Sequence, residues 1–206
     1  MMELFELASG KPLSQEEEGS ARRIQLVIRA TLASVVFAAL YGLAAGSTDL
    51  ALALGNLYKM PMVILLSTAC ALPVGLLTWK MTGAQNRASD LLIAVASGNF
   101  TATLVLASLA PIVALYYHTS GYMGGALALG VASFALLIGL YSAIRAVLSR
   151  IPVGVTRRSA ALPMVVLLGA QVASLVQFIH VASPILPEIT VFDGGMDAII
   201  DGHGGL

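Results

Sequence analysis

The sequence predicts an all-α integral membrane protein, a polytopic bundle of five transmembrane helices, on three observations. First, apolar residues make up 58% of the 206 residues and charged residues only 11%, with a mean hydropathy of +0.88. A soluble domain usually carries about 25% charged residues, because water must solvate its surface. Second, the chain contains apolar runs long enough to cross the roughly 30 Å hydrocarbon core of a bilayer. Third, basic residues gather in alternate connections between these runs.

The apolar runs define the expected spans. They cover residues 24–46, 60–79, 91–117, 122–144 and 160–181. Pro73 and Pro111 predict kinks rather than helix ends, because neighbouring helices in a membrane can satisfy the freed carbonyl groups. A four-span alternative makes the stretch around Pro73 re-entrant. Thr48 or Asp49 can cap a short helix before the second span, and we expect that helix to lie in the outer membrane interface.

The positions of the basic residues predict the orientation, because cytoplasmic loops are enriched in lysine and arginine. If the N-terminus lies inside, the outer segments contain Lys59 as their single basic residue. The inner segments then contain Lys11, Arg22, Arg23, Arg29, Lys80, Arg87, Arg145, Arg150, Arg157 and Arg158. We therefore expect a cytoplasmic segment 1–21, a five-helix bundle 22–183 and an acidic external tail 184–206, with the N-terminus inside and the C-terminus outside.

The N-terminal 21 residues do not resemble a signal peptide. They hold five glutamates and one lysine, and they lack an apolar core preceded by positive charge. The first apolar run is therefore expected to be a retained anchor.

Composition and motifs exclude several classes of function. A formal net charge of zero argues against a nucleic-acid partner, since no basic excess is present to displace phosphate counterions. No nucleophile elbow, zinc-protease motif or phosphate-binding loop occurs in the sequence, so an enzyme is not expected. The single cysteine, Cys70, lies within an apolar run and predicts no disulfide within the chain. No metal site or cofactor is predicted.

Polar residues inside the third and fifth spans form the first candidate site. Asn99 and Thr103 are four residues apart and share a helix face, and the fifth span carries Gln171 and Gln177. Amides buried in lipid without a partner cost several kcal/mol, so hydrogen bonds between helices are expected. Such bonds are one interpretation, and the lining of a polar path for a solute is the other.

Small residues at four-residue spacing predict close helix packing, because they let two backbones approach in lipid. The pairs are Gly42 and Gly46, Gly121 and Gly125, and Gly169 and Ala173. Packing within the bundle is one interpretation. The alternative is a docking face for another subunit or for a second copy of the chain.

The histidines lie toward the outer side. His118 ends the third span and His180 lies near the end of the fifth, so a haem or pigment held between two helices is geometrically possible. Their spacing, however, matches no established zinc, calcium or haem pattern. The alternative is that they anchor the helix ends at the membrane surface.

The tail combines acidic and apolar residues, which predicts a surface that docks on a partner. Exposed apolar residues in such a segment are unfavourable unless something covers them. The residues expected to make this contact are Phe192, Asp193, Met196, Asp197 and Asp201.

Some stretches resemble a group of five-span bacterial membrane proteins that is distantly similar to Yip1-type membrane proteins. They are Ala39-Leu40-Tyr41-Gly42, Leu57-Tyr58-Lys59-Met60-Pro61, Ala71-Leu72-Pro73 and Gly169-Ala170-Gln171, followed by Pro184 and Pro187. The resemblance implies the five-span plan with the N-terminus inside and a location in the bacterial cytoplasmic (inner) membrane. It implies no activity.

Together these observations predict a non-catalytic membrane subunit that scaffolds or docks onto a larger complex. Its expected partners are the lipid bilayer and either other membrane-protein subunits or a second copy. A small transporter or channel with a polar path at Asn99, Thr103 and Gln171 is the alternative. A haem- or pigment-binding subunit is a third interpretation.

Overall fold

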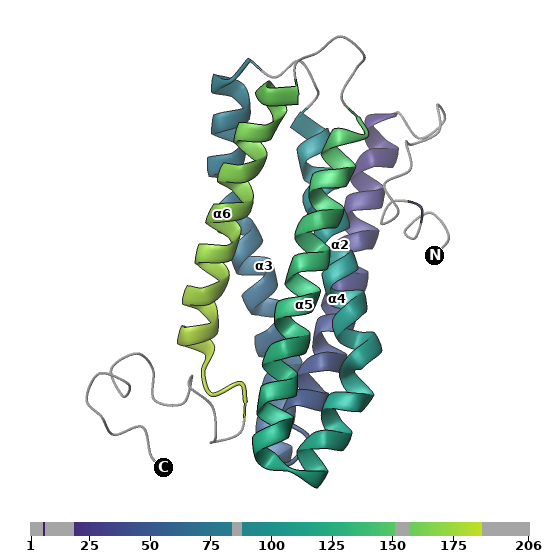
Figure 1. The fold of residues 1–206 in the computed structure, drawn as a ribbon. Coiled ribbons are helices and arrows are strands. Elements are labelled where there is room, and N and C mark those ends of the chain that lie inside the picture. Colours follow the sequence, from purple (N-terminus) through teal and green to yellow (C-terminus); the bar gives the residue numbers. More distant parts are fainter. Residues whose placement is uncertain (1–5, 7–18, 84–87, 151–156, 187–206) are drawn as a thin grey trace, which may run out of the picture.

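The computed structural model describes residue 6 and residues 19–83, 88–150 and 157–186, and every regular element in that part of the chain is helical. Five helices are long and apolar enough to cross a membrane, as the sequence predicts. They are α2 (Ser20–Ala45), α3 (Leu50–Met81), α4 (Ala88–Thr119), α5 (Gly121–Leu148) and α6 (Arg157–Ala182). All five run along one common axis (Figure 1).

The helices extend beyond the apolar runs, and the largest difference is in α3. The segment expected to form a separate interfacial helix is instead the first part of α3, which continues through Pro61 and Pro73 without a break. Its 32 residues span about 48 Å at 1.5 Å per residue, more than the hydrocarbon core requires. Asp49 caps this helix, its carboxylate accepting from the amides of Ala51 at 2.8 Å and Leu52 at 3.4 Å. The continuous α3 also removes the four-span alternative.

The five helices are arranged in an open ring. Helix α2 packs against both α3 and α4, α5 packs along α4, and α6 packs along α3. Helices α5 and α6 touch each other little, and so do α3 and α4. The ring therefore runs α6–α3–α2–α4–α5 and is left open between α5 and α6, where Figure 1 shows the two ribbons apart.

One end of the bundle is filled by an apolar cluster. Helices α2, α4 and α6 begin at this end, and α3 and α5 finish there. We call it the basic end, after the basic residues of the segments that connect the helices there. Trp79 of α3, Leu91 of α4, Val147 of α5 and Leu167 of α6 belong to one buried cluster at this end. The two sides of the open ring are thus joined at the basic end by apolar packing.

Glycine allows a close contact between α4 and α5. A Cβ atom on Gly98 would lie 2.9 Å from the carbonyl oxygen of Gly139, and one on Gly139 would lie 2.8 Å from the carbonyl oxygen of Gly98. Ala102 and Ala143, each four residues further along, flank this contact. Small residues at this spacing let helix backbones approach in lipid. This Gly-xxx-Ala pair of motifs was not singled out from the sequence.

Candidate functional site

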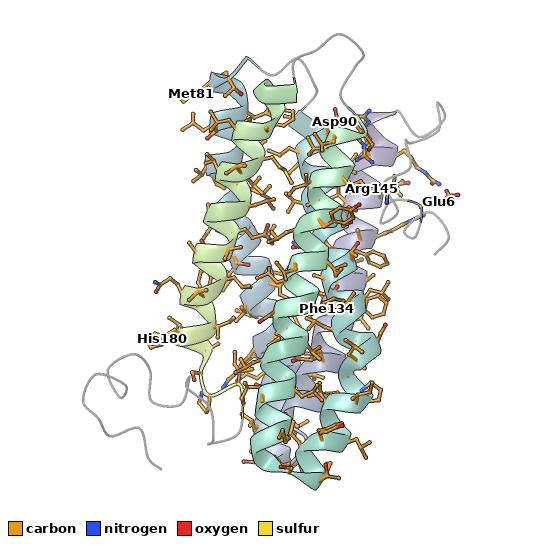
Figure 2. The ribbon with its side chains drawn as sticks, viewed as in Figure 1. Glu6, Met81, Asp90, Phe134, Arg145 and His180 are labelled. Carbon is orange, nitrogen blue, oxygen red and sulfur yellow. The ribbon has the colours of Figure 1, made fainter. Side chains whose placement is uncertain are left out.

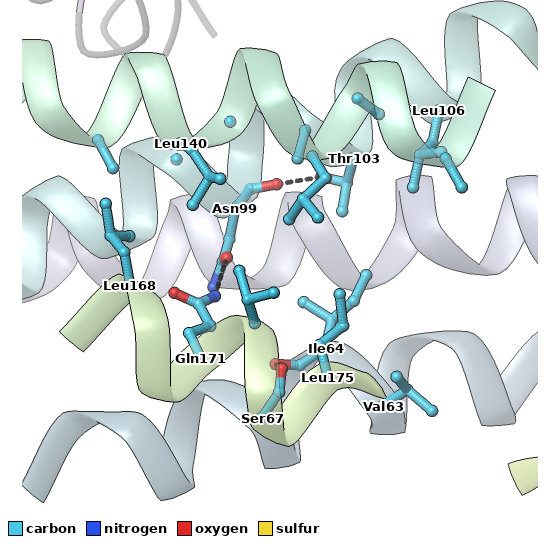
Figure 3. Close-up of a pocket in the computed structure, with 18 of the residues that line it drawn as sticks. Val63, Ile64, Ser67, Asn99, Thr103, Leu106, Leu140, Leu168, Gln171 and Leu175 are labelled. Carbon is cyan, nitrogen blue, oxygen red and sulfur yellow. Dashed lines mark hydrogen bonds between the residues drawn. The ribbon is translucent and has the colours of Figure 1, made fainter. Parts of the chain in front are cut away.

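Three helices meet in a cluster of polar side chains, contributed by Asn99 of α4, Gln171 of α6 and Thr68 of α3. The Gln171 amide nitrogen donates to Asn99 Oδ1 at 2.8 Å and to Thr68 Oγ1 at 3.3 Å. The Asn99 amide nitrogen donates to Thr68 Oγ1 at 2.8 Å. The bond between Gln171 and Asn99, drawn in Figure 3, connects α6 with α4, two helices on opposite sides of the open ring. The cluster therefore holds the ring together at mid-span.

The Thr68 hydroxyl determines how the two amides are oriented. Its single hydrogen is donated to the carbonyl of Ile64 at 2.8 Å, which leaves only lone pairs for other partners. Each amide group that faces Thr68 Oγ1 must consequently be the NH₂ donor. Asn99 then turns Oδ1 toward Gln171, and Gln171 must present its nitrogen to both.

The other two predicted polar residues do not join the cluster. Thr103 is fully buried, and its hydroxyl donates to the carbonyls of Asn99 at 2.8 Å and Phe100 at 3.1 Å, both in its own helix. Gln177 is exposed on α6 and makes no hydrogen bond with the described residues. Thr68 was missed from the sequence, although the adjacent Ser67 and Thr68 are a polar interruption of an apolar span.

A cavity of about 110 Å³ lies beside the cluster, between α3, α4, α5 and α6. It extends from Val95 and Ala143, which belong to the apolar cluster, to Met60 and Ile179, which lie toward the opposite end of the bundle. Leu136, Leu140, Leu168, Val172 and Leu175 supply much of its wall on the α5 and α6 side. Among the described residues its polar lining is Asn99, Thr103, Gln171 and Ser67, and no charged residue of that part of the chain lines it. The cavity is thus apolar with one polar region.

A second, much smaller pocket lies on the other side of Asn99. It has a volume of about 10 Å³, and Thr31 and Ser34 of α2 line it together with Asn99. The rest of its lining is apolar, so Thr31, Ser34 and Asn99 are its polar residues. The polar groups around Asn99 therefore form a layer across the bundle, from α2 to α6. They do not form a row along the length of the helices.

Another polar contact joins α4 and α5. The hydroxyl of Ser142 lies 3.2 Å from that of Ser97 and 3.0 Å from that of Thr101. Hydroxyl pairs of this kind contribute to helix association in lipid. This contact accounts for the polar stretch in α4 that does not face the cavity.

The small-residue pairs differ in where they lie. Gly42 and Gly46 face α3, where added Cβ atoms would meet the backbone of Asn56 and Ala53. In the second pair Gly125 is buried, while Gly121 is described only as the first residue of α5.

The third pair does not pack within the bundle. A Cβ on Gly169 would meet nothing within 4 Å, and Ala173 is exposed. This corrects the interpretation of that pair as intramolecular packing. Docking on another subunit or on a second copy of the chain stays a prediction for this pair.

The two histidines do not face a common interior. His118 and His180 are both exposed, at the ends of α4 and α6, and Figure 2 shows His180 directed away from the bundle. No group of three or more histidine, cysteine, aspartate or glutamate side chains in the described part of the chain is placed to hold a metal ion. Haem or pigment binding at these residues remains a prediction.

A charged cluster lies at the basic end. Arg23 of α2 donates to Asp90 of α4 at 2.8 Å and to Ser89 at 2.9 Å, and the paired side chains are 10% and 9% exposed. Beyond the end of α5, burial lowers the pKa of Arg150; the Asp90 carboxylate opposes this shift and Arg23 adds to it. Asp90 thus compensates two guanidinium groups. The sequence offered a signal for it, an acid at a span start among basic connections.

The beginning of the tail returns to α3. The buried Asn56 side chain donates to the carbonyl of Ile185 at 2.6 Å, and Lys59 donates to that of Pro184 at 2.9 Å. Ile185 and Leu186 are buried against the bundle. The residues predicted to dock on a partner, at 192–201, lie outside the described part of the chain, so that prediction stands as it was made.

Comparison with known proteins leaves the chain without an assigned family. It matches no protein-family model, no curated protein and no solved structure. The resemblance to five-span bacterial and Yip1-type proteins is therefore still a prediction. The chain is a multi-pass membrane protein by its five membrane-spanning helices, and its function must be argued from its own geometry.

Proposed function

We propose that this protein binds a lipid-soluble molecule in the cavity between α3, α4, α5 and α6. The observation that carries the proposal is an apolar cavity with one polar region at mid-span and, within the described part of the chain, no charged lining residue. Ligand sites typically combine apolar walls with a few polar groups that fix the orientation of the ligand. Here Gln171 and Asn99 are those groups, and the rest of the lining suits a hydrocarbon chain.

Access from the bilayer fits the packing of the helices. The ring of helices is open between α5 and α6, and the leucines at 136, 140, 168 and 175 on these two helices line the cavity. A lipid-soluble molecule in the surrounding membrane could therefore reach the cavity sideways, without crossing a polar surface. The volume, about 110 Å³, is below that of an apolar cavity that holds benzene, about 150 Å³. A segment of a chain fits, with the remainder lying between α5 and α6.

The same geometry favours binding over a polar path. A path for a hydrophilic solute needs polar groups along its length, because an uncompensated polar group in hydrocarbon is costly. Asn99, Gln171 and Thr68 are instead bonded to one another in a layer at one depth. Above and below that layer the cavity lining is largely apolar.

Filling the cavity is expected to abolish binding. Val172 lines the cavity, whereas Val176, one turn further along α6, is 52% exposed and does not line it. With a long-chain photoreactive lipid probe that carries a diazirine, Val172→Phe should lose the labelling of cavity-lining peptides that the wild type shows. Val176→Phe makes the same change toward lipid and should keep it. Mass spectrometry of the labelled peptides is the measurement, and thermal unfolding of both variants controls for folding.

Two results would contradict the proposal. One is labelling confined to the outer surface of the helices in the wild type. The other is equal labelling of the cavity in the two phenylalanine variants.

A second candidate function is the scaffold subunit predicted from the sequence, and one observation favours it. Gly169, Ala173 and Gln177 are all exposed at four-residue spacing on α6, so they form one stripe. Gln177 lies within the span with no hydrogen-bond partner among the described residues. An amide in this position gains from a partner on another helix, and the small residues let that helix approach. The stripe is a surface for a helix of another subunit.

Photocrosslinking tests this stripe. A photocrosslinking side chain at Ala173 is expected to give one discrete protein product in native membranes, and Gln177→Leu should weaken it. The control position is Leu137 on α5, which is 64% exposed outside the stripe. If both positions give only lipid adducts, the stripe faces lipid and this second candidate is wrong.

A further inference from the structure

In the polar region of the cavity, the Gln171 side chain offers a ligand a hydrogen-bond acceptor. Both hydrogen bonds of the Gln171 side chain use its amide nitrogen, while its carbonyl oxygen, Oε1, makes none with the described residues. Figure 3 shows this oxygen turned away from Asn99. The orientation is fixed by the Thr68 hydroxyl, whose hydrogen goes to Ile64, so that Gln171 must direct its nitrogen toward the cluster. The group left for a ligand is an acceptor.

The hydroxyl groups of the lining add no donor, and the Asn99 amide nitrogen already donates one of its hydrogens to Thr68. Ser67 and Thr103 each donate their hydroxyl hydrogen to a backbone carbonyl of their own helix. Asn99 Oδ1 already accepts from Gln171. An anionic head such as a phosphate would find no positive charge among the residues that the structure describes around the cavity. Burying such a charge without a partner is costly.

We infer that the ligand is an uncharged lipid alcohol, whose hydroxyl donates to Gln171 Oε1 while its chain occupies the apolar part of the cavity. This inference rests on the proposed function and adds the chemical class of the ligand. A neutral hydrogen bond contributes about 0.5–1.5 kcal/mol net, which corresponds to a preference of roughly 3- to 10-fold. An ether or a hydrocarbon of the same length cannot make the bond.

The test compares two photoreactive probes that differ only in whether they carry a hydroxyl group that can donate a hydrogen bond. One is a long-chain primary alcohol with a diazirine in its chain, and the other is its methyl ether, both titrated against the full chain in phosphatidylcholine nanodiscs. In the wild type, half-maximal labelling of cavity peptides is expected at a concentration roughly 3- to 10-fold lower for the alcohol. In Gln171→Leu the preference should disappear or reverse, because the hydroxyl would be desolvated with no acceptor.

The possible results distinguish a failure of the alcohol assignment from a failure of the proposed function. If the alcohol and the ether label the wild-type cavity equally, and Val172→Phe removes both, the cavity binds lipid-soluble molecules and the alcohol assignment is wrong. If neither probe labels the cavity, the proposed function fails as well. Should Gln171→Leu not fold, the wild-type comparison of the two probes still decides, because it requires no variant.

Discussion

Replacing Asp90 with alanine is expected to lower the free energy of unfolding by about 3–5 kcal/mol. The carboxylate is paired with Arg23 at 2.8 Å in a nearly buried position, and Arg150 is close enough to feel its charge. Removing the acid leaves the partly buried Arg23 without this ion pair and takes away a carboxylate that acts on Arg150 at the basic end. A reversible unfolding titration with sodium dodecyl sulfate in mixed micelles measures the change.

A matched control separates the ion pair from the general effect of losing an aspartate. Asp49→Ala removes a carboxylate that only caps α3, and its expected cost is about 1 kcal/mol. The double variant Arg23→Met with Asp90→Ala should recover part of the loss, because removing both partners leaves fewer unpaired charges. Equal costs for the two alanine variants would mean that the pair does not stabilise the bundle.

Replacing Gly139 with leucine is expected to separate α4 from α5 and to cost about 3 kcal/mol, at the upper end of typical overpacking penalties. A Cβ at this position would lie 2.8 Å from the carbonyl oxygen of Gly98 and 2.7 Å from the Cβ of Ala102. The oxygen belongs to the backbone, so relief requires a whole helix to move. Thermal unfolding in detergent and the yield of folded protein measure the loss.

Gly130 provides the control on the same helix. A Cβ there meets nothing within 4 Å and the residue is exposed, so Gly130→Leu is expected to be neutral or slightly stabilising through helix propensity. If both leucine variants lose the same stability, the cost comes from glycine replacement in α5 generally. The close contact between α4 and α5 would then not be what holds the two helices together.

The spans were predictable from the sequence because bilayer thickness imposes a length that an apolar run must meet. The helix ends were not, since helices continue through the interface, where polar residues are tolerated. The first part of α3 illustrates this: Asp49 was identified as a possible cap, but the helix that it begins runs on to Met81. Composition indicates which residues lie in the hydrocarbon layer, whereas hydrogen bonding determines where the helix begins and ends.

The candidate site was predictable from the sequence only in part. Asn99 and Gln171 were singled out because a polar side chain in lipid requires a partner. That they bond to each other through Thr68 depends on the order of the helices around the ring, which no local pattern encodes. The cavity depends on the same order, because it lies where α5 and α6 fail to close on each other. Threonine is common in membrane helices, so Thr68 was not distinguishable from residues that bond only to their own backbone.

Native mass spectrometry tests the binding proposal most directly. The protein is released from nanodiscs formed with the lipids of its own membrane, and its mass is compared among the wild type, Val172→Phe and Val176→Phe. The proposal predicts that wild type and Val176→Phe retain one uncharged lipid-soluble molecule per chain, and that Val172→Phe, which fills the cavity, does not. A wild-type chain that carries no such molecule, or a Val172→Phe chain that keeps it, would contradict the account.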